Sequence, residues 1–269
     1  MTQKDRPAVD RRRPIDGLLR TGLGLLGVVF AVVVWQVAAQ VLAGAGGRIS
    51  VLAAPGAVAR RLVTYASGDL LADVLASLEV FAAGWFVGGV AATVTGLLLG
   101  RVRLLRRMFY PVIEALRPVS SIAWVPLSVV WFGLGYGSKV FLVALAVYLV
   151  VIVYAVDGSS RIAPELERTA RMLGMGSWRR SRSLVLPSTM SEVVIGLRVA
   201  LMAGWGTVIV AELVAANSGL GRHLIASQQS YDVESVMAAM LCFAAVGFLL
   251  NAAFNLVQAR LVPWQRTAS

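Results

Sequence analysis

The sequence is poor in the residue types that most often carry catalysis or metal binding. It has one cysteine, Cys242, and one histidine, His223, which excludes an internal disulfide and a histidine pair for a metal. The only lysines, Lys4 and Lys139, do not follow glycine, so the Gly-Lys-Ser/Thr loop that binds nucleotide phosphates is absent from the sequence. Any work driven by ATP would need a nucleotide-binding partner. His223 stands beside Arg222 in a polar segment, where we expect a solvated loop residue.

Charge is also scarce, and apolar residues are in excess. Charged residues make up 14% of the chain and apolar residues 58%, with a mean hydropathy of +0.76. Because a soluble domain has only about half apolar residues, the composition predicts a membrane protein, and apolar runs of bilayer-spanning length predict that it is all-α. No stretch between the apolar runs is long enough to form a core of its own, which indicates one helical bundle.

The net charge of +11 does not indicate nucleic acid, because of where the basic residues lie. Most lysines and arginines fall in four clusters, at residues 4–20, 101–107, 161–182 and 260–266. These clusters alternate with weakly charged segments, as the positive-inside rule describes, so all four are expected in the cytoplasm. The partner of the chain would be a lipid bilayer and no nucleic acid.

Six apolar runs are long enough to cross a bilayer as helices, which takes about 20 residues. They cover residues 23–43, 80–99, 108–132, 140–156, 193–216 and 236–257. We therefore expect a single transmembrane domain over 23–262, a basic cytoplasmic segment over 1–22 and a tail over 263–269, with both termini cytoplasmic. Segments 44–78 and 217–234 would be outer loops, the first with a short surface helix after Pro55.

The third apolar run is unusual in containing three prolines together with Glu114 and Arg117. Proline leaves backbone carbonyls that lipid cannot satisfy, so this run should face protein or a cavity. Glu114 and Arg117 are three residues apart, which places them on one helix face as an ion pair.

Residues 158–188 form a basic loop between the fourth and fifth apolar runs. Pro164 suits a first helical position and Gly174 a left-handed stop, which predicts a short helix over 164–173. Ser177 would cap a second short helix that ends at Pro187. Two short capped helices make a rigid knob for docking into a groove on another protein.

The loop has Ala170 and Gly174 separated by three residues, and a Leu-Pro pair at 186–187. This resembles the coupling loop of ATP-binding-cassette (ABC) importer permeases, whose pattern is EAA, three residues, Gly, nine residues, then Ile-x-Leu-Pro. Arg168 stands where the pattern has Glu, and acidic residues just before it would take that place. The resemblance implies a set of ATPase-coupling residues: Glu165, Glu167, Arg168, Ala170, Arg171, Leu173, Gly174, Trp178, Arg179, Leu186 and Pro187.

Two further stretches carry Arg-Pro, Ala-Trp, Pro-Leu and Trp-Phe-Gly (residues 115–139) and Gly-Leu-Arg, Gly-Trp, Ala-Glu-Leu and Ser-Gly-Leu-Gly (residues 196–221). Both are similar to the permeases that serve taurine, alkanesulfonate, nitrate and bicarbonate uptake. Our candidates for the translocation path come from these stretches: Arg117, Trp124, Trp131, Arg198, Trp205 and Glu212. As alternatives, the charged residues pair or reach the membrane surface, and the tryptophans anchor there.

The resemblance implies a type I ABC importer permease fold and a non-catalytic subunit in the bacterial inner membrane. It implies a homodimer of permeases, two cytoplasmic ABC ATPase subunits that bind ATP and Mg²⁺, and an extracytoplasmic substrate-binding protein. The chain itself would hold no cofactor and no metal. The solute would be small and anionic, similar to a sulfonate, nitrate or taurine.

Two other classes remain open from the residues alone. A secondary transporter or channel, not coupled to ATP, would need ion-binding groups at mid-membrane, and a membrane enzyme would need a dyad or metal cluster there. Neither is visible in the sequence. The small residues Gly196, Gly204 and Gly206 allow helices to approach closely, either within one subunit or at a dimer seam.

Overall fold

The protein is described by a computed structural model over residues 15–44, 52–160, 168–170, 172–176, 179, 182–183, 186–214 and 218–261. All elements in these ranges are helical, as the apolar runs predict. They are α1 (Ile15–Gly44), α2 (Pro55–Ala66), α3 (Leu70–Arg101), α4 (Arg103–Leu116), the 3-10 helix η1 (Ser121–Trp124), α5 (Val125–Phe132), α6 (Tyr136–Ser160), α9 (Leu186–Val214), α10 (Leu220–Gln229) and α11 (Val233–Leu261).

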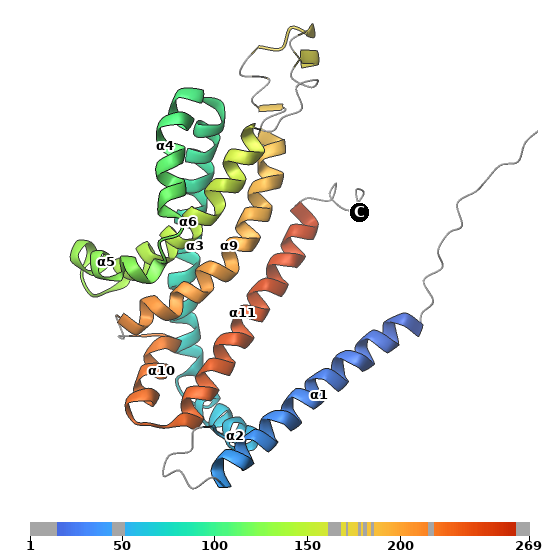
Figure 1. Ribbon diagram of the computed structural model, residues 1–269, viewed down its shortest axis with the longest axis vertical. Helices are drawn as coiled ribbons and strands as arrows, with labels where there is room; N and C mark the ends of the chain where they lie inside the picture. The colour runs from blue at the N-terminus through green and yellow to red at the C-terminus, as the bar shows by residue number, and fades with distance from the viewer. Residues whose placement is uncertain are drawn as a thin grey trace, which may run out of the picture.

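Helices α3, α6 and α9 pack together at the centre of the bundle (Figure 1). They approach closely because glycines face the neighbouring backbone. A Cβ at Gly88 of α3 would overlap the carbonyl of Ala144 of α6, and one at Gly196 of α9 would lie 2.8 Å from Tyr154 of α6. Gly196 therefore serves packing within the subunit, whereas a Cβ at Gly206 would face open space.

Four of the described helices, α3, α6, α9 and α11, are long and apolar enough to span a membrane. Helix α4 and the η1–α5 pair would together count as a fifth span, with a bend of 98° between them. The bend follows Pro118, one of the three prolines of the third apolar run. The apolar part of α1, Leu26–Leu42, is shorter, and α1 joins the bundle through Trp35, whose Nε1 donates to the Ala53 carbonyl at 3.0 Å.

The bundle has two distinct ends (Figure 1). Helices α3 and α11 begin near α2 and α10 and run to the opposite end. Helix α6 begins beside α5 and runs to that same end, and α9 runs back. We call the first the α2–α10 end. We call the other the basic end, because Arg101, Arg103 and the described loop residues 168–183 lie there.

The α2–α10 end differs from the sequence expectation in two places. Helix α2 confirms a short helix after Pro55, but α3 begins at Leu70, well before the span predicted from residue 80. The segment 217–234 contains helix α10 rather than only a loop. The expectation failed because Asp73 and Ser77 are typical of a polar loop, yet both are buried inside the bundle.

Candidate functional site

The loop over residues 158–188 ends its described helical turn at Gly174, as the sequence predicts. Gly174 has a φ of +69°, in the left-handed region that favours glycine. The N–H of Met175 donates to the carbonyl of Ala170 at 3.0 Å, and the N–H of Leu173 donates to that of Thr169 at 3.0 Å. A bond that spans six residues around a left-handed glycine is a Schellman cap, which stops a helix rigidly.

In this turn one small side chain is buried against the protein and two apolar side chains are exposed. Ala170 is 3% exposed, whereas Met172 and Leu173 are 86% and 74% exposed. Arg168 and Arg179 are exposed as well. Of the predicted coupling residues, Glu165, Glu167, Arg171 and Trp178 lie outside the described residues, as do the start of the first predicted helix and the side chain of Pro187.

A cavity of about 560 Å³ opens beside the bend between α4 and η1. Arg117 and Glu114 line it and form the predicted ion pair, at 3.2 Å from Nη1 to Oε1. Ser121 and Thr207 also line the cavity, and their hydroxyls are 3.3 Å apart. The remaining wall comes from the α4–η1 turn and from α6 and α9: Pro118, Val119, Ser120, Leu145, Ala146, Leu149, Val150 and Ala203. The cavity therefore combines charged, hydroxyl and apolar surfaces.

The other five path candidates do not line this cavity. Trp205 is 4% exposed, stacks on Phe243 at 4.3 Å and donates from Nε1 to the Phe243 carbonyl at 3.1 Å, so it joins α9 to α11. Trp131 and Arg198 are exposed, and Trp124 is half-buried in η1. Glu212 is completely buried near the end of α9, against the start of α10.

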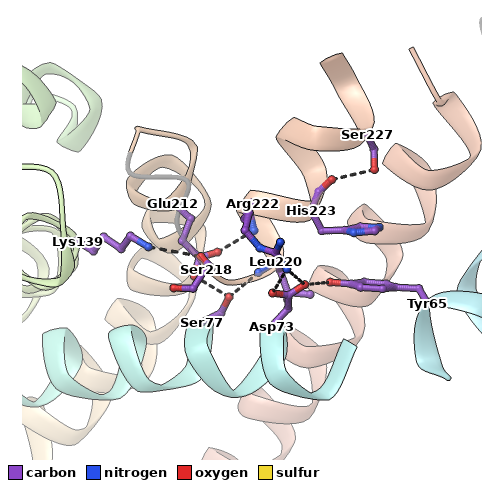
Figure 2. Close-up of polar contacts among 11 residues, drawn as sticks. Tyr65, Asp73, Ser77, Lys139, Glu212, Ser218, Leu220, Arg222, His223 and Ser227 are labelled. Carbon is purple, nitrogen blue, oxygen red and sulfur yellow. Dashed lines mark hydrogen bonds and ion pairs between the residues drawn. The ribbon is translucent and has the colours of Figure 1, made fainter. Parts of the chain in front are cut away.

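A cluster of polar side chains surrounds Glu212 (Figure 2). We define the polar cluster as Tyr65, Asp73, Ser77, Lys139, Glu212 and Arg222. Its members come from α2, α3, α6, α9 and α10, and four of them, Asp73, Ser77, Lys139 and Glu212, are at most 4% exposed. Ionisable groups are costly to bury in a membrane protein unless each has a partner.

Asp73 receives two of these partners. Its carboxylate accepts a hydrogen bond from the Tyr65 hydroxyl at 2.7 Å and forms an ion pair with Arg222 at 3.1 Å. Burial, together with the hydrogen bond to Asp73, raises the pKa of Tyr65 far above its usual value, so the phenol stays protonated. The bond to Asp73 likewise raises the pKa of Arg222.

His223 takes part in this packing, and the expectation of a solvated loop residue was wrong. It lies in α10, half-buried, with its ring stacked on that of Tyr65 at a centroid distance of 3.8 Å. Burial lowers the pKa of His223. The sequence showed a lone histidine in a polar segment, which gives no indication that an aromatic ring from α2 covers it.

Most of the polar cluster was missed by sequence reasoning, which singled out Glu212 alone. A weak signal did exist: the Ala-Glu-Leu and Ser-Gly-Leu-Gly motifs stand close together in residues 211–221. The structure brings them into contact, since a Cβ at Gly219 or Gly221 would collide with Glu212. Asp73 and Ser77 carried no comparable signal, because their partners are far away in the chain.

Helices long enough to span a membrane, arranged around a cavity with both polar and apolar walls, are typical of a multi-pass membrane transport protein. The family comparison is more specific: residues 88–267 match the model of the binding-protein-dependent transport system inner membrane component, and the chain belongs to this family. It is therefore a transmembrane ABC transporter permease. The resemblance drawn from the coupling loop is confirmed.

Several relatives match over nearly their whole length. The taurine transport system permease protein TauC of Escherichia coli is 30% identical over 94% of this chain and 92% of its own. A probable ABC transporter permease protein of Brucella abortus is 30% identical over 92% and 98%. The bicarbonate transport system permease protein CmpB of Synechococcus elongatus is 27% identical over 89% and 88%. These relatives confirm the subgroup that residues 115–139 and 196–221 indicate.

Proposed function

We propose that this permease belongs to an ATP-driven importer of a small anionic solute and is coupled to its ATPase subunits through residues 164–187. The observation that carries this proposal is the outward placement of Met172 and Leu173 on a turn that Gly174 caps. Large apolar side chains that stay exposed on a rigid turn are typical of a surface that docks into another protein. Closure of the ATPase subunits would then move the ends of α6 and α9, which flank the loop.

We propose a topology of six spans: α1, α3, the bent α4–η1–α5 unit, α6, α9 and α11. The basic end would lie in the cytoplasm with both termini, as the positive-inside rule requires, and the α2–α10 end would lie outside. The membrane would be the bacterial inner membrane. An extracytoplasmic binding protein would deliver the solute at the α2–α10 end.

The cavity beside Arg117 is our candidate for part of the translocation path in a homodimer. The side chains of Arg117 and Glu114 are each more than 40% exposed. An exposed ion pair contributes only about 0–1 kcal/mol to stability. An anion can therefore compete with Glu114 for the guanidinium. Two relatives, a putative aliphatic sulfonates transport permease of Bacillus subtilis and the bicarbonate transport permease of Synechococcus elongatus, support an anionic solute. Trp205 and Glu212 lie away from the cavity, and we propose the path without them.

The coupling role can be tested by reconstituting the permease with its ATPase subunits and binding protein in proteoliposomes. We expect Leu173→Asp to abolish co-purification of the ATPase and ATP-dependent uptake, with an unchanged thermal unfolding midpoint because Leu173 is exposed. Leu71→Asp is the matched control: Leu71 is 69% exposed on α3 at the opposite end, and this variant should still bind the ATPase.

Two results would contradict the proposal. Normal ATPase binding by the Leu173→Asp variant would remove the coupling role from the turn. Uptake that continues with a hydrolysis-dead ATPase would indicate a secondary transporter or channel.

A further inference from the structure

Helix α10 has no side-chain cap of its own, because its N-cap residue is Gly219. The first N–H groups of a helix need acceptors when they are buried. Here the acceptors come from two other helices. The N–H of Gly221 donates to Glu212 Oε2 of α9 at 2.8 Å, and the N–H of Leu220 donates to Ser77 Oγ of α3 at 3.0 Å (Figure 2).

Ser77 and Glu212 also bind each other. The Ser77 hydroxyl donates to Glu212 Oε1 at 2.7 Å, so both carboxylate oxygens and the hydroxyl are hydrogen-bonded. A carboxylate at a helix N-terminus is further stabilised by the positive end of the helix dipole. Glu212 and Ser77 thus act as a shared cap that ties the start of α10 to α3 and α9.

The glycines of the Ser-Gly-Leu-Gly motif follow from this arrangement. Gly219 has a φ of +98°, and a Cβ there would overlap the Glu212 carboxylate. A Cβ at Gly221 would lie 2.5 Å from the Glu212 Cβ. The turn before α10 is therefore shaped to the side chain that caps it.

The charges around the cap are balanced. Lys139 of α6 is 4% exposed, and its Nζ donates to the Ser218 carbonyl at 3.4 Å, just before the cap. On the other side of α10, Arg222 pairs with Asp73 of α3. Two acidic and two basic side chains thus hold one short helix, and the three that are buried, Asp73, Lys139 and Glu212, each have a polar partner there.

We propose that Glu212 is the positioning residue of α10: it fixes this helix against α3 and so sets the external surface on which the substrate-binding protein docks. The second half of this proposal rests on the proposed function. Tyr65 of α2, stacked on His223, extends the same rigid unit. Loss of the cap would release the start of α10 while leaving the α3–α6–α9 packing in place.

Hydrogen–deuterium exchange of the full chain in lipid nanodiscs tests the first half without any transport activity. Glu212→Gln replaces one acceptor oxygen by an amide group that cannot accept, and Ser77→Ala removes the acceptor of Leu220. We expect both variants to exchange severalfold faster in peptides covering residues 218–232, with no change in α3, α6 or the rest of α9. Glu234→Gln, a partly exposed carboxylate on α11, is the matched control and should leave exchange unaltered.

Exchange in Glu212→Gln and Ser77→Ala that equals that of the parent protein would overturn the positioning role. So would a uniform increase over the whole bundle, because that would mark Glu212 as a general stability residue. A second experiment tests whether Glu212 positions the docking surface. It measures the binding-protein concentration that gives half-maximal stimulation of ATPase activity in the reconstituted complex. We expect it to rise severalfold in Glu212→Gln, and an unchanged value would overturn the second half.

The two proposals fail in different ways. If the parent complex shows no stimulation by a binding protein, the proposed function fails, while the exchange result still decides the role of Glu212.

Discussion

Gly88 of α3 lies directly against the backbone of Ala144 of α6, so closely that a Cβ at Gly88 would overlap the Ala144 carbonyl. The same close contact continues along the helix pair, with Gly84 against Val143 and Gly96 against Ala155. Small residues of this kind let helices associate in lipid, where burial of apolar surface gives little drive. The close approach of α3 and α6 thus depends on the glycines of α3.

Gly88→Ala should destabilise the bundle. The added methyl group has no space, and overpacking of a filled interface costs about 1–3 kcal/mol. The thermal unfolding midpoint of the purified protein in detergent measures the effect. Gly56→Ala in α2 is the control, since a Cβ there meets nothing within 4 Å, and its midpoint should equal or slightly exceed that of the parent.

Arg117→Gln should impair uptake more than Arg198→Gln. Arg117 lines the cavity and its guanidinium pairs with Glu114, whereas Arg198 is exposed elsewhere on α9. We expect a raised KM for ATP-dependent uptake in the first variant, with ATPase binding intact, and near-parent kinetics in the second. Equal effects of the two substitutions would argue against the cavity as the path.

Tyr65→Phe should lower the free energy of unfolding without altering the fold. The variant loses the 2.7 Å hydrogen bond to the buried Asp73 carboxylate, and hydrogen bonds to charged groups contribute about 1.5–3 kcal/mol. Thermal unfolding detects the loss. Tyr231→Phe provides the comparison, because Tyr231 is 78% exposed and its hydroxyl should contribute little.

Mild acid should weaken the α2–α10 end through His223. Its pKa is lowered in the folded protein by burial, so the unfolded chain binds the proton more readily. The stability that the neutral His223 ring contributes is therefore fully present above the unfolded pKa of about 6.5. It declines as the pH falls through that value. We expect the unfolding midpoint to fall over this range.

His223→Phe keeps an aromatic ring over Tyr65 but removes the titrating group. Its midpoint should fall less steeply between neutral and mildly acidic pH than that of the parent. Identical pH profiles would show that His223 does not carry the dependence.

Features that depend on neighbours in the chain were predictable from the sequence. Hydropathy located the spanning helices α3, α6, α9 and α11, and Pro55 marked the start of α2. The left-handed stop at Gly174 and the Glu114–Arg117 pair were also predictable, because a cap and a pair three residues apart are settled within one turn of helix.

The polar cluster depended on the tertiary structure instead. Ser77 and Glu212 are 135 positions apart and Asp73 and Arg222 are 149 apart. A polar residue ahead of an apolar run has the same local pattern whether water or a buried partner satisfies it, which is why Asp73 suggested a loop and His223 a solvated side chain. Only the packing of α2, α3, α9 and α10 decided that these groups are buried, because the free energy of burial is set by partners that the local sequence does not contain.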